Sequence, residues 1–266
     1  MKAQQLFDVT GEVAVVTGAA SGLGLAFSEV MADNGAHVVM VDSNSETLAQ
    51  SVAALHGRGL SVEGAVADIS DHAAITRAID EAAAKHGHID AVFANAGMSA
   101  GPGYATTADG AIERTQMEIF DKVVAVNLTG TFNTVEAAAP HMKKQHGGHI
   151  VITSSDAGVK GQPMCGYAYA LTKAAIANLA RQAALELAPY NVTVNAIAPG
   201  PFLTNFAGGR MRKDPAARKA MEERVPLHRF AETTEIQGLA LLLGSPASSF
   251  ITGTVISIDG GSTAGG

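Results

Sequence analysis

The segment TGAASGLGLAFSEV, residues 17–30, joins a short β-branched run to a helical pattern. Gly18, Gly22 and Gly24 stand at that junction, in the spacing GxxxGxG rather than GxGxxG. Residues without a Cβ let the chain turn tightly and let helix and strand pack closely. They also let backbone N–H groups at the helix start approach an anion such as a pyrophosphate. Because glycines serve plain turns as well, the spacing alone leaves both interpretations open.

The next apolar run, HVVMVD at 37–42, ends in Asp42, 18 residues after Gly24. In a dinucleotide-binding unit, an acid about 20 residues beyond the glycines binds the ribose hydroxyls. A carboxylate there accepts hydrogen bonds from a ribose diol and repels a 2′-phosphate. Neither Ala20 nor Ser43 supplies a cation to offset that repulsion. The pattern therefore predicts NAD rather than NADP, with a plain strand-end turn as the alternative interpretation of Asp42.

Short β-branched runs alternate with Ala-rich helical patterns along the chain. Runs that are apolar on both faces and separated by helices indicate a parallel sheet covered on both sides. We predict one domain over residues 1–266, a Rossmann-type, doubly wound, seven-stranded parallel sheet flanked by helices on both faces. Two segments interrupt the alternation, 98–114 and 201–231, and the second contains an expected substrate lid at about 202–230. The predicted strands are 13–18, 37–42, 61–68, 91–96, 149–155, 193–200 and 255–261.

The composition excludes several classes of protein. The chain has 266 residues, a formal net charge of −7 and one cysteine. A net negative charge disfavours nucleic acid or an anionic membrane as the main partner. One cysteine cannot form an internal disulfide, and neither a signal region nor a membrane-length apolar stretch is evident, so we expect a cytoplasmic protein. The nine histidines show no HxxxH or comparable cluster, so we expect no catalytic metal.

A second short segment, YAYALTK at 167–173, suggests acid–base chemistry. On a helix, Tyr169 and Lys173 are four residues apart and share a face, whereas Tyr167 faces elsewhere. A tyrosine with a pKa near its usual value of about 10 is a poor base at neutral pH, and a nearby ammonium favours the phenolate. In an arbitrary helix such a pair is usually solvated, so the interpretation depends on the rest of the chain.

The motifs taken together resemble the classical short-chain dehydrogenase/reductase family over nearly the whole chain. The matching stretches are TGAASGLG, NAG at 95–97, VNLTG at 126–130, SS at 154–155, YALTK at 169–173 and PGPFLT at 199–204. The resemblance implies that Asn127, Ser155, Tyr169 and Lys173 form a catalytic tetrad. It also implies a cofactor site made of Gly18, Ser21, Gly22, Leu23, Gly24, Asp42, Ser43, Asp68, Ile69, Asn95, Ala96, Gly97, Tyr169, Lys173, Pro199, Gly200, Phe202 and Thr204.

Within that site the resemblance gives individual residues separate tasks. Asp68 meets the adenine amino group, Asn95 ties the fourth strand to its neighbours, and the segment 199–204 holds the nicotinamide carboxamide. Ser155 hydrogen-bonds the substrate oxygen and Asn127 holds a water behind Lys173.

The sequence departs from the family pattern at two places. A frequent double asparagine is here Ala94-Asn95, and the gap from Ser155 to Tyr169 is 14 residues, one longer than in many members. The SSxxG pattern selects Ser155, with Ser154 as the alternative.

The function implied is a hydride transfer between NAD(H) and a modest secondary alcohol or ketone. The pocket is expected from 98–104, 156–166 and the lid. The basic stretch 208–213 could recognise an acidic substrate, although a solvated helix end is favoured. In the family, helices corresponding to 115–146 and 168–188 pair across a twofold axis, so we expect a homotetramer. The alternatives are a non-catalytic NAD(H)-binding regulator, a 3-oxoacyl-thioester reductase, or a lyase, epimerase or dehalogenase of the same fold.

Overall fold

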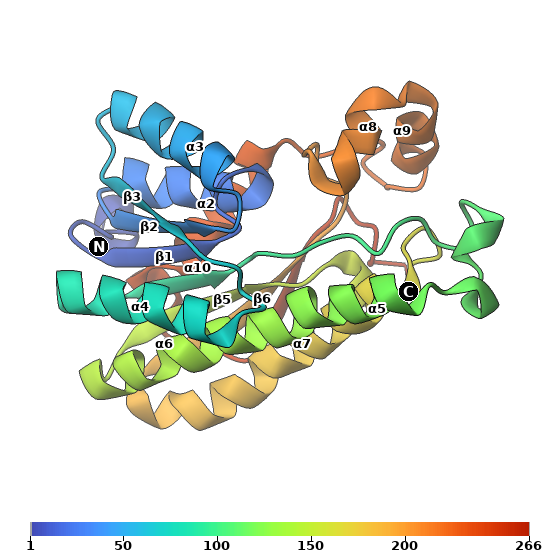
Figure 1. Cartoon of the computed structure of the whole chain (residues 1–266). Coiled ribbons are helices and arrows are strands. Elements are labelled where there is room, and N and C mark those ends of the chain that lie inside the picture. Colours follow the sequence, from blue (N-terminus) through green and yellow to red (C-terminus); the bar gives the residue numbers. More distant parts are fainter. Residues whose placement is uncertain (1, 266) are drawn as a thin grey trace.

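Seven strands form one parallel sheet in the order β3-β2-β1-β4-β5-β6-β7 in the computed structural model, which describes residues 2–265 (Figure 1). This topology confirms the predicted Rossmann-type sheet. Every pair of neighbouring strands is parallel. The strands are β1 (Val13–Thr17), β2 (His37–Asp42), β3 (Val62–Val66), β4 (Ala91–Ala94), β5 (Gly148–Thr153), β6 (Val192–Pro199) and β7 (Val255–Ile258).

Two helical layers cover the sheet, as the sequence predicts. The helices α2 (Gly22–Asp33), α3 (Ser45–Gly57) and α10 (Gln237–Leu243) pack on one face; α4 (His72–His86), α6 (Thr131–Gln145) and α7 (Tyr167–Leu187) pack on the other (Figure 1). Alternate residues of a strand point to opposite faces, so Val15 joins one core and Val16 the other. Central strands apolar on both faces therefore need both layers.

The two edge strands do not follow the prediction of burial on both faces. Side chains of β3 alternate between buried and more exposed, and Val66 is 63% exposed. Among the described residues of β7, none is fully buried. An edge strand has a neighbour on one side only, which leaves part of its surface uncovered. Several predicted strands also end early, because the residues that follow them turn toward the site described below.

The predicted long helix from 115 to 146 is wrong as a single element. It divides into α5 (Met117–Val123), a π-helical segment η3 (Val124–Gly130) and α6. A π-turn carries one extra residue per turn, and such turns occur often at functional sites. Gly130 ends the segment where a Cβ would lie 2.6 Å from Cγ1 of Ile69.

The remaining helical elements are short. Within residues 2–265 no helix is both long and apolar enough to cross a membrane. The elements α8 (Arg210–Lys213) and α9 (Pro215–Glu222) stand apart from the two layers in Figure 1 and lie inside the predicted lid. The short elements are α1 (Ala3–Leu6), η1 (Ala108–Gly110), η2 (Ile112–Arg114), η4 (Asp156–Gly158), η5 (Ala188–Tyr190), η6 (Phe206–Gly209), α8 (Arg210–Lys213), α9 (Pro215–Glu222), η7 (Thr233–Ile236) and η8 (Pro246–Ser248).

Candidate active site

The glycine turn after β1 is built on close backbone approach. Gly18 has a positive φ of 66°, which favours glycine. A Cβ on Gly24 would lie 2.1 Å from the carbonyl oxygen of Gly18, so any side chain there would push the helix from the strand. Among the described residues, no side chain caps α2 at Ser21, and the first N–H groups of the helix stay available. This turn can hold an anion at the helix start.

Asp42 lies against that turn from the end of β2. Its Oδ2 accepts a hydrogen bond from the backbone N–H of Ala20 at 3.1 Å, and its Oδ1 accepts from the N–H of Asn44 at 2.9 Å. Asp42 is half-buried, whereas its neighbour Ser43 is exposed. The carboxylate therefore lies beside the glycine turn, where a ribose-binding acid is predicted.

Asp68 and Ile69 follow β3 farther along the same edge of the sheet. The exposed Asp68 accepts hydrogen bonds at Oδ1 from the N–H of Ser70 at 2.9 Å and from its hydroxyl at 2.7 Å. Ile69 is buried, and its carbonyl accepts from Nδ2 of Asn133 at 3.0 Å. A short turn thus presents one exposed carboxylate at the position expected for the adenine contact.

Asn95 joins β4 to β1. Its Nδ2 donates to the carbonyl of Thr17 at 3.0 Å, and its N–H donates to the Thr17 hydroxyl at 3.0 Å. Ala96 N–H donates to the same hydroxyl at 3.2 Å. The chain then passes close to Lys173 at Gly97, where a Cβ would lie 3.4 Å from Nζ of Lys173. These bonds hold 95–97 at the carboxyl edge of the sheet.

Tyr169 and Lys173 lie on one face of α7, as their spacing predicts. The Nζ atom of Lys173 lies 5.6 Å from the centre of the Tyr169 ring and donates to the carbonyl of Thr153 at 2.7 Å. Lys173 is 4% exposed, and this burial lowers its pKa to about 8. Burial also raises the pKa of the half-buried Tyr169, against the effect of a hydrogen bond with Ser155. The ammonium is thus held beside the phenol.

The two neighbouring serines have different partners. The hydroxyl of Ser154 donates to the backbone carbonyl of Lys173 at 2.8 Å. The hydroxyl of Ser155 donates to Oδ1 of Asp156 at 2.9 Å. Its hydrogen bond with Tyr169 lowers the pKa of that tyrosine. Ser154 therefore anchors α7 to β5, while Ser155 lies beside the tyrosine. This difference supports the choice of Ser155 over Ser154.

Asn127 lies in the π-helical segment η3 and is fully buried. Its Oδ1 accepts from the N–H of Met98 at 2.7 Å, and its Nδ2 donates to the carbonyl of Met98 at 2.9 Å. The side chain thus fixes the loop after β4, and the expected role of the backbone in holding a water behind Lys173 stays a prediction. The π-helical backbone distinguishes this position from one in a regular α-helix.

Asp156 belongs to the predicted pocket segment 156–166, but the sequence indicated no role for it beside Ser155. It is 8% exposed, and burial raises its pKa. Its two oxygens accept from Ser155 and from Nε2 of Gln162, the latter at 3.1 Å. Asp156 occupies a variable position of the SSxxG pattern, so nothing in the motif marked it.

The segments expected to form the substrate pocket do meet. Pro102 and Cys165 form an isolated antiparallel bridge, which joins 98–104 to 156–166. The rings of Tyr104 and Tyr167 stack at 6.3 Å between centres. Burial raises the pKa of the Cys165 thiol to about 12, which fits an inert thiol rather than a nucleophile.

The segment predicted as a lid contacts the site through Phe206 and Arg212. The Phe206 ring lies 5.8 Å from that of Tyr169, centre to centre. Nη2 of Arg212 donates to the carbonyl of Leu203 at 2.8 Å, which ties the lid to the 199–204 segment. A pocket of about 220 Å³ lies beside it, lined by Thr204 and by Gly22 of the glycine turn. The side chain of Arg210, part of the basic stretch 208–213, lies outside what the structure describes.

The segment 199–204 continues from β6 toward the glycine turn. Gly200 is packed so closely that a Cβ would lie 2.7 Å from Cα of Asp259. Phe202 is buried and pairs with Ala231 in an isolated bridge. The segment ends at Thr204, whose side chain lies 3.6 Å from the position of a Cβ on Gly22 in the glycine turn, and its place beside a nicotinamide stays a prediction.

Comparisons with known proteins agree on one family of oxidoreductases. A family model described as Enoyl-(Acyl carrier protein) reductase matches residues 18–263. The 3-oxoacyl-(acyl-carrier-protein) reductase FabG of Thermotoga maritima is 37% identical over 94% of this chain and 97% of its own.

Two solved structures have the same fold and carry different cofactors. A gluconate 5-dehydrogenase from Burkholderia cenocepacia, in complex with NADP and tartrate, superposes with a TM-score of 0.88 at 31% identity, covering 99% of both chains. A 3-oxoacyl-acyl-carrier-protein reductase from Brucella melitensis with bound NAD superposes with a TM-score of 0.84 at 32% identity, covering 99% of this chain and 96% of that one.

Proposed function

The chain belongs to the classical short-chain dehydrogenase/reductase family, and from that premise we propose that it is an NAD(H)-dependent oxidoreductase acting on a secondary alcohol or ketone. When bound, the nicotinamide supplies the acceptor or donor of the hydride. The observation that carries the proposal is the position of the buried Lys173 ammonium, 5.6 Å from the centre of the Tyr169 ring.

Each residue of the tetrad has a task that its surroundings support. Tyr169 takes the proton from the alcohol oxygen and returns it in the reverse reaction. Lys173 favours the phenolate through its charge. Ser155 donates a hydrogen bond to the substrate oxygen, where negative charge develops. For this the hydroxyl turns from Asp156 toward the substrate. Asn127 holds the Met98 loop over Lys173.

The residues present fit a dinucleotide, and we propose NAD rather than NADP. The open start of α2 suits the pyrophosphate, and Asp42 suits a ribose diol. Both cofactors occur among the structural neighbours, so the preference rests on the Asp42 charge. Calorimetric titration with NADH and NADPH tests it. We expect tighter binding of NADH, and a smaller difference for Asp42→Ala; equal affinities in the unaltered protein would contradict the proposal.

The small and apolar segments around Tyr169 support a modest secondary alcohol. A second candidate is a 3-oxoacyl thioester, because the Thermotoga maritima and Brucella melitensis relatives both carry that name. An absorbance assay at the NADH band, run over cyclic alcohols, sugar acids and a 3-oxoacyl thioester, separates the two. If NADH binds but no substrate is turned over, the result would favour the alternative of a non-catalytic NAD(H)-binding regulator.

We also propose a homotetramer built on α5, α6 and α7. Large apolar side chains on these helices are exposed, among them Phe132 (51%), Leu171 (56%) and Leu185 (77%). Exposed apolar area of this kind marks interaction surfaces. Sedimentation should give a species near four times 27.1 kDa; a monomer would contradict the assembly. The cytoplasmic location stays a prediction.

A further inference from the structure

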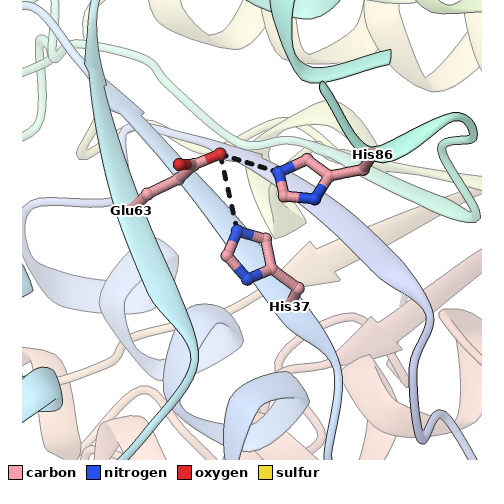
Figure 2. Close-up of side chains that lie close together, drawn as sticks. All are labelled: His37, Glu63 and His86. Carbon is pink, nitrogen blue, oxygen red and sulfur yellow. Dashed lines mark hydrogen bonds and ion pairs between the residues drawn. The ribbon is translucent and has the colours of Figure 1, made fainter. Parts of the chain in front are cut away.

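A cluster of possible metal ligands lies at the amino-terminal edge of the sheet, far from the catalytic residues at the carboxyl edge. His37 begins β2, Glu63 is the second residue of β3 and His86 ends α4. The sequence separates these residues and showed no histidine cluster, yet one ligand atom from each lies within 4.8 Å of the others. Figure 2 shows both imidazole rings directed at one carboxylate oxygen.

The strand register explains the convergence. Val39 of β2 is paired with Glu63 of β3, and His37 lies two residues before Val39. Residues two apart on a strand share a face, so His37 and Glu63 point to the same side of the sheet. That side is covered by α4, whose last residue brings His86 to the pair.

The distances are close to those of a zinc site. Nε2 of His37 lies 3.4 Å from Oε1 of Glu63, and Nε2 of His86 lies 2.8 Å from the same oxygen. Zinc bonds of about 2.0–2.2 Å at tetrahedral angles place ligand atoms roughly 3.3–3.5 Å apart. One contact already has this spacing, and the other needs to lengthen by about half an ångström.

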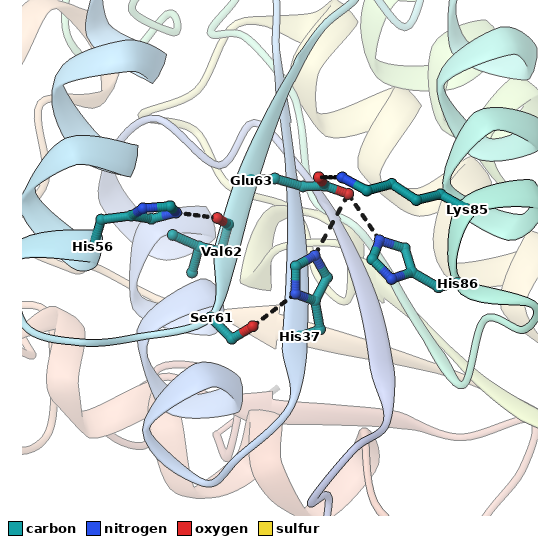
Figure 3. Close-up of polar contacts among 7 residues, drawn as sticks. All are labelled: His37, His56, Ser61, Val62, Glu63, Lys85 and His86. Carbon is teal, nitrogen blue, oxygen red and sulfur yellow. Dashed lines mark hydrogen bonds and ion pairs between the residues drawn. The ribbon is translucent and has the colours of Figure 1, made fainter.

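One ring nitrogen of the cluster, Nε2 of His37, has the Glu63 carboxylate near it but makes no hydrogen bond with good geometry to any residue between 2 and 265. This nitrogen is buried. Nδ1 of the same ring is hydrogen-bonded to the Ser61 hydroxyl at 2.7 Å (Figure 3). A histidine held at one nitrogen by a hydroxyl while the other faces a carboxylate is arranged as metal-binding histidines are.

From these contacts we propose that His37, Glu63 and His86 bind a divalent transition-metal ion of the zinc type, with water as the fourth ligand. Two imidazoles and one carboxylate suit such an ion. The ion would join β2, the edge strand β3 and the end of α4, and so stabilise the sheet edge. It lies apart from the proposed chemistry and does not depend on it.

Lys85 is the group that opposes binding. Its ammonium pairs with the second oxygen of Glu63 (Figure 3). The Lys85 side chain is 60% exposed, so its ammonium can move from the Glu63 oxygen into solvent when a metal ion binds. The zinc affinity therefore reflects competition between two cations for Glu63.

The test uses the untagged full chain, stripped with a chelator and titrated with zinc chloride by calorimetry. We expect one zinc ion per chain and a higher Tm in excess zinc. Cobalt chloride should give the visible absorption of a tetrahedral site. His37→Gln and His86→Gln should each weaken zinc binding at least about 10-fold, as loss of ligand support does elsewhere. No saturable binding, or binding that survives both changes, overturns the proposal.

Two further variants keep the test decisive if a histidine variant fails to fold. His72→Gln removes a histidine at the other end of α4 that forms an exposed pair with Glu136, and should leave zinc affinity unchanged. Lys85→Met removes the competing charge and should tighten zinc binding by roughly 3- to 10-fold. Unchanged or weaker binding in Lys85→Met overturns the proposal. NADH binding measured in the same samples reports separately on the proposed function.

Discussion

Tyr167 and Tyr169 are the same chemical group two positions apart on α7, yet their neighbours differ. Tyr169 has Lys173 and Phe206 beside its ring, whereas Tyr167 stacks on Tyr104. We expect Tyr169→Phe to lower kcat at least about 10²-fold, because the proton-transfer group is lost. Tyr167→Phe, the matched control, should stay within about tenfold. Steady-state kinetics on both variants checks this, with NADH binding unchanged; the reverse result would remove Tyr169 from the mechanism.

Asp156 acts on the same tyrosine through its charge. Burial raises the pKa of Tyr169, and the Asp156 carboxylate adds to that increase. Asp156→Asn keeps an oxygen for the Ser155 hydroxyl but removes the charge, so the Tyr169 pKa should fall. Since alcohol oxidation needs the deprotonated tyrosine, the rising arm of its pH–rate profile should move to lower pH. An unchanged pH–rate profile would show that the charge of Asp156 does not affect the pKa of Tyr169.

At the scale of elements, contact between η4 and α7 keeps the tetrad together. A Cβ on Gly158 would lie 2.6 Å from the carbonyl carbon and oxygen of Lys173 and 2.7 Å from Oγ of Ser154. Gly158→Ala should therefore displace α7, with a lower Tm and a lower kcat. Gly161→Ala is the control, because the described residues place no heavy atom within 4 Å of a Cβ there. Thermal unfolding and kinetics compare the two, and equal behaviour would refute this role for the contact.

The sequence predicted elements better than their ends. Short β-branched runs identified all seven strands, although only the central ones are buried on both faces and the edge strands β3 and β7 are not. The sequence pattern did not identify η3, since a π-turn has the same composition as a helix and depends on contacts such as Asn127 with Met98. In the same way, short motifs indicated Tyr169 and Lys173, whereas Asp156 and the His37–Glu63–His86 cluster depend on packing and strand register that no local pattern contains.

For the whole molecule, acid stability should depend on His149, a half-buried residue of β5. Burial lowers its pKa to about 4 from the usual 6.5, and its Nδ1 contacts the Thr193 hydroxyl at 2.9 Å. As the pH falls, His149 takes up a proton in the unfolded chain before it does so in the folded protein. The contribution of neutral His149 to the free energy of unfolding is therefore complete above pH 6.5 and is lost as the pH falls toward 4. The loss is on the order of 3 kcal/mol. Tm measured against pH for His149→Gln should fall less over that range; parallel curves would exclude His149 as the cause.

The strand order β3-β2-β1-β4-β5-β6-β7 has a consequence for synthesis on the ribosome. Each strand after β1 adds to an outer edge of the strands that precede it in the chain, and none has to be inserted between two strands already paired. The half that carries the glycine turn and Asp42 is finished by β4, before the residues of the tetrad emerge. Synthesis delivers the chain from the amino terminus onward. The sheet can therefore grow in the order of translation, with no pairing that must be undone.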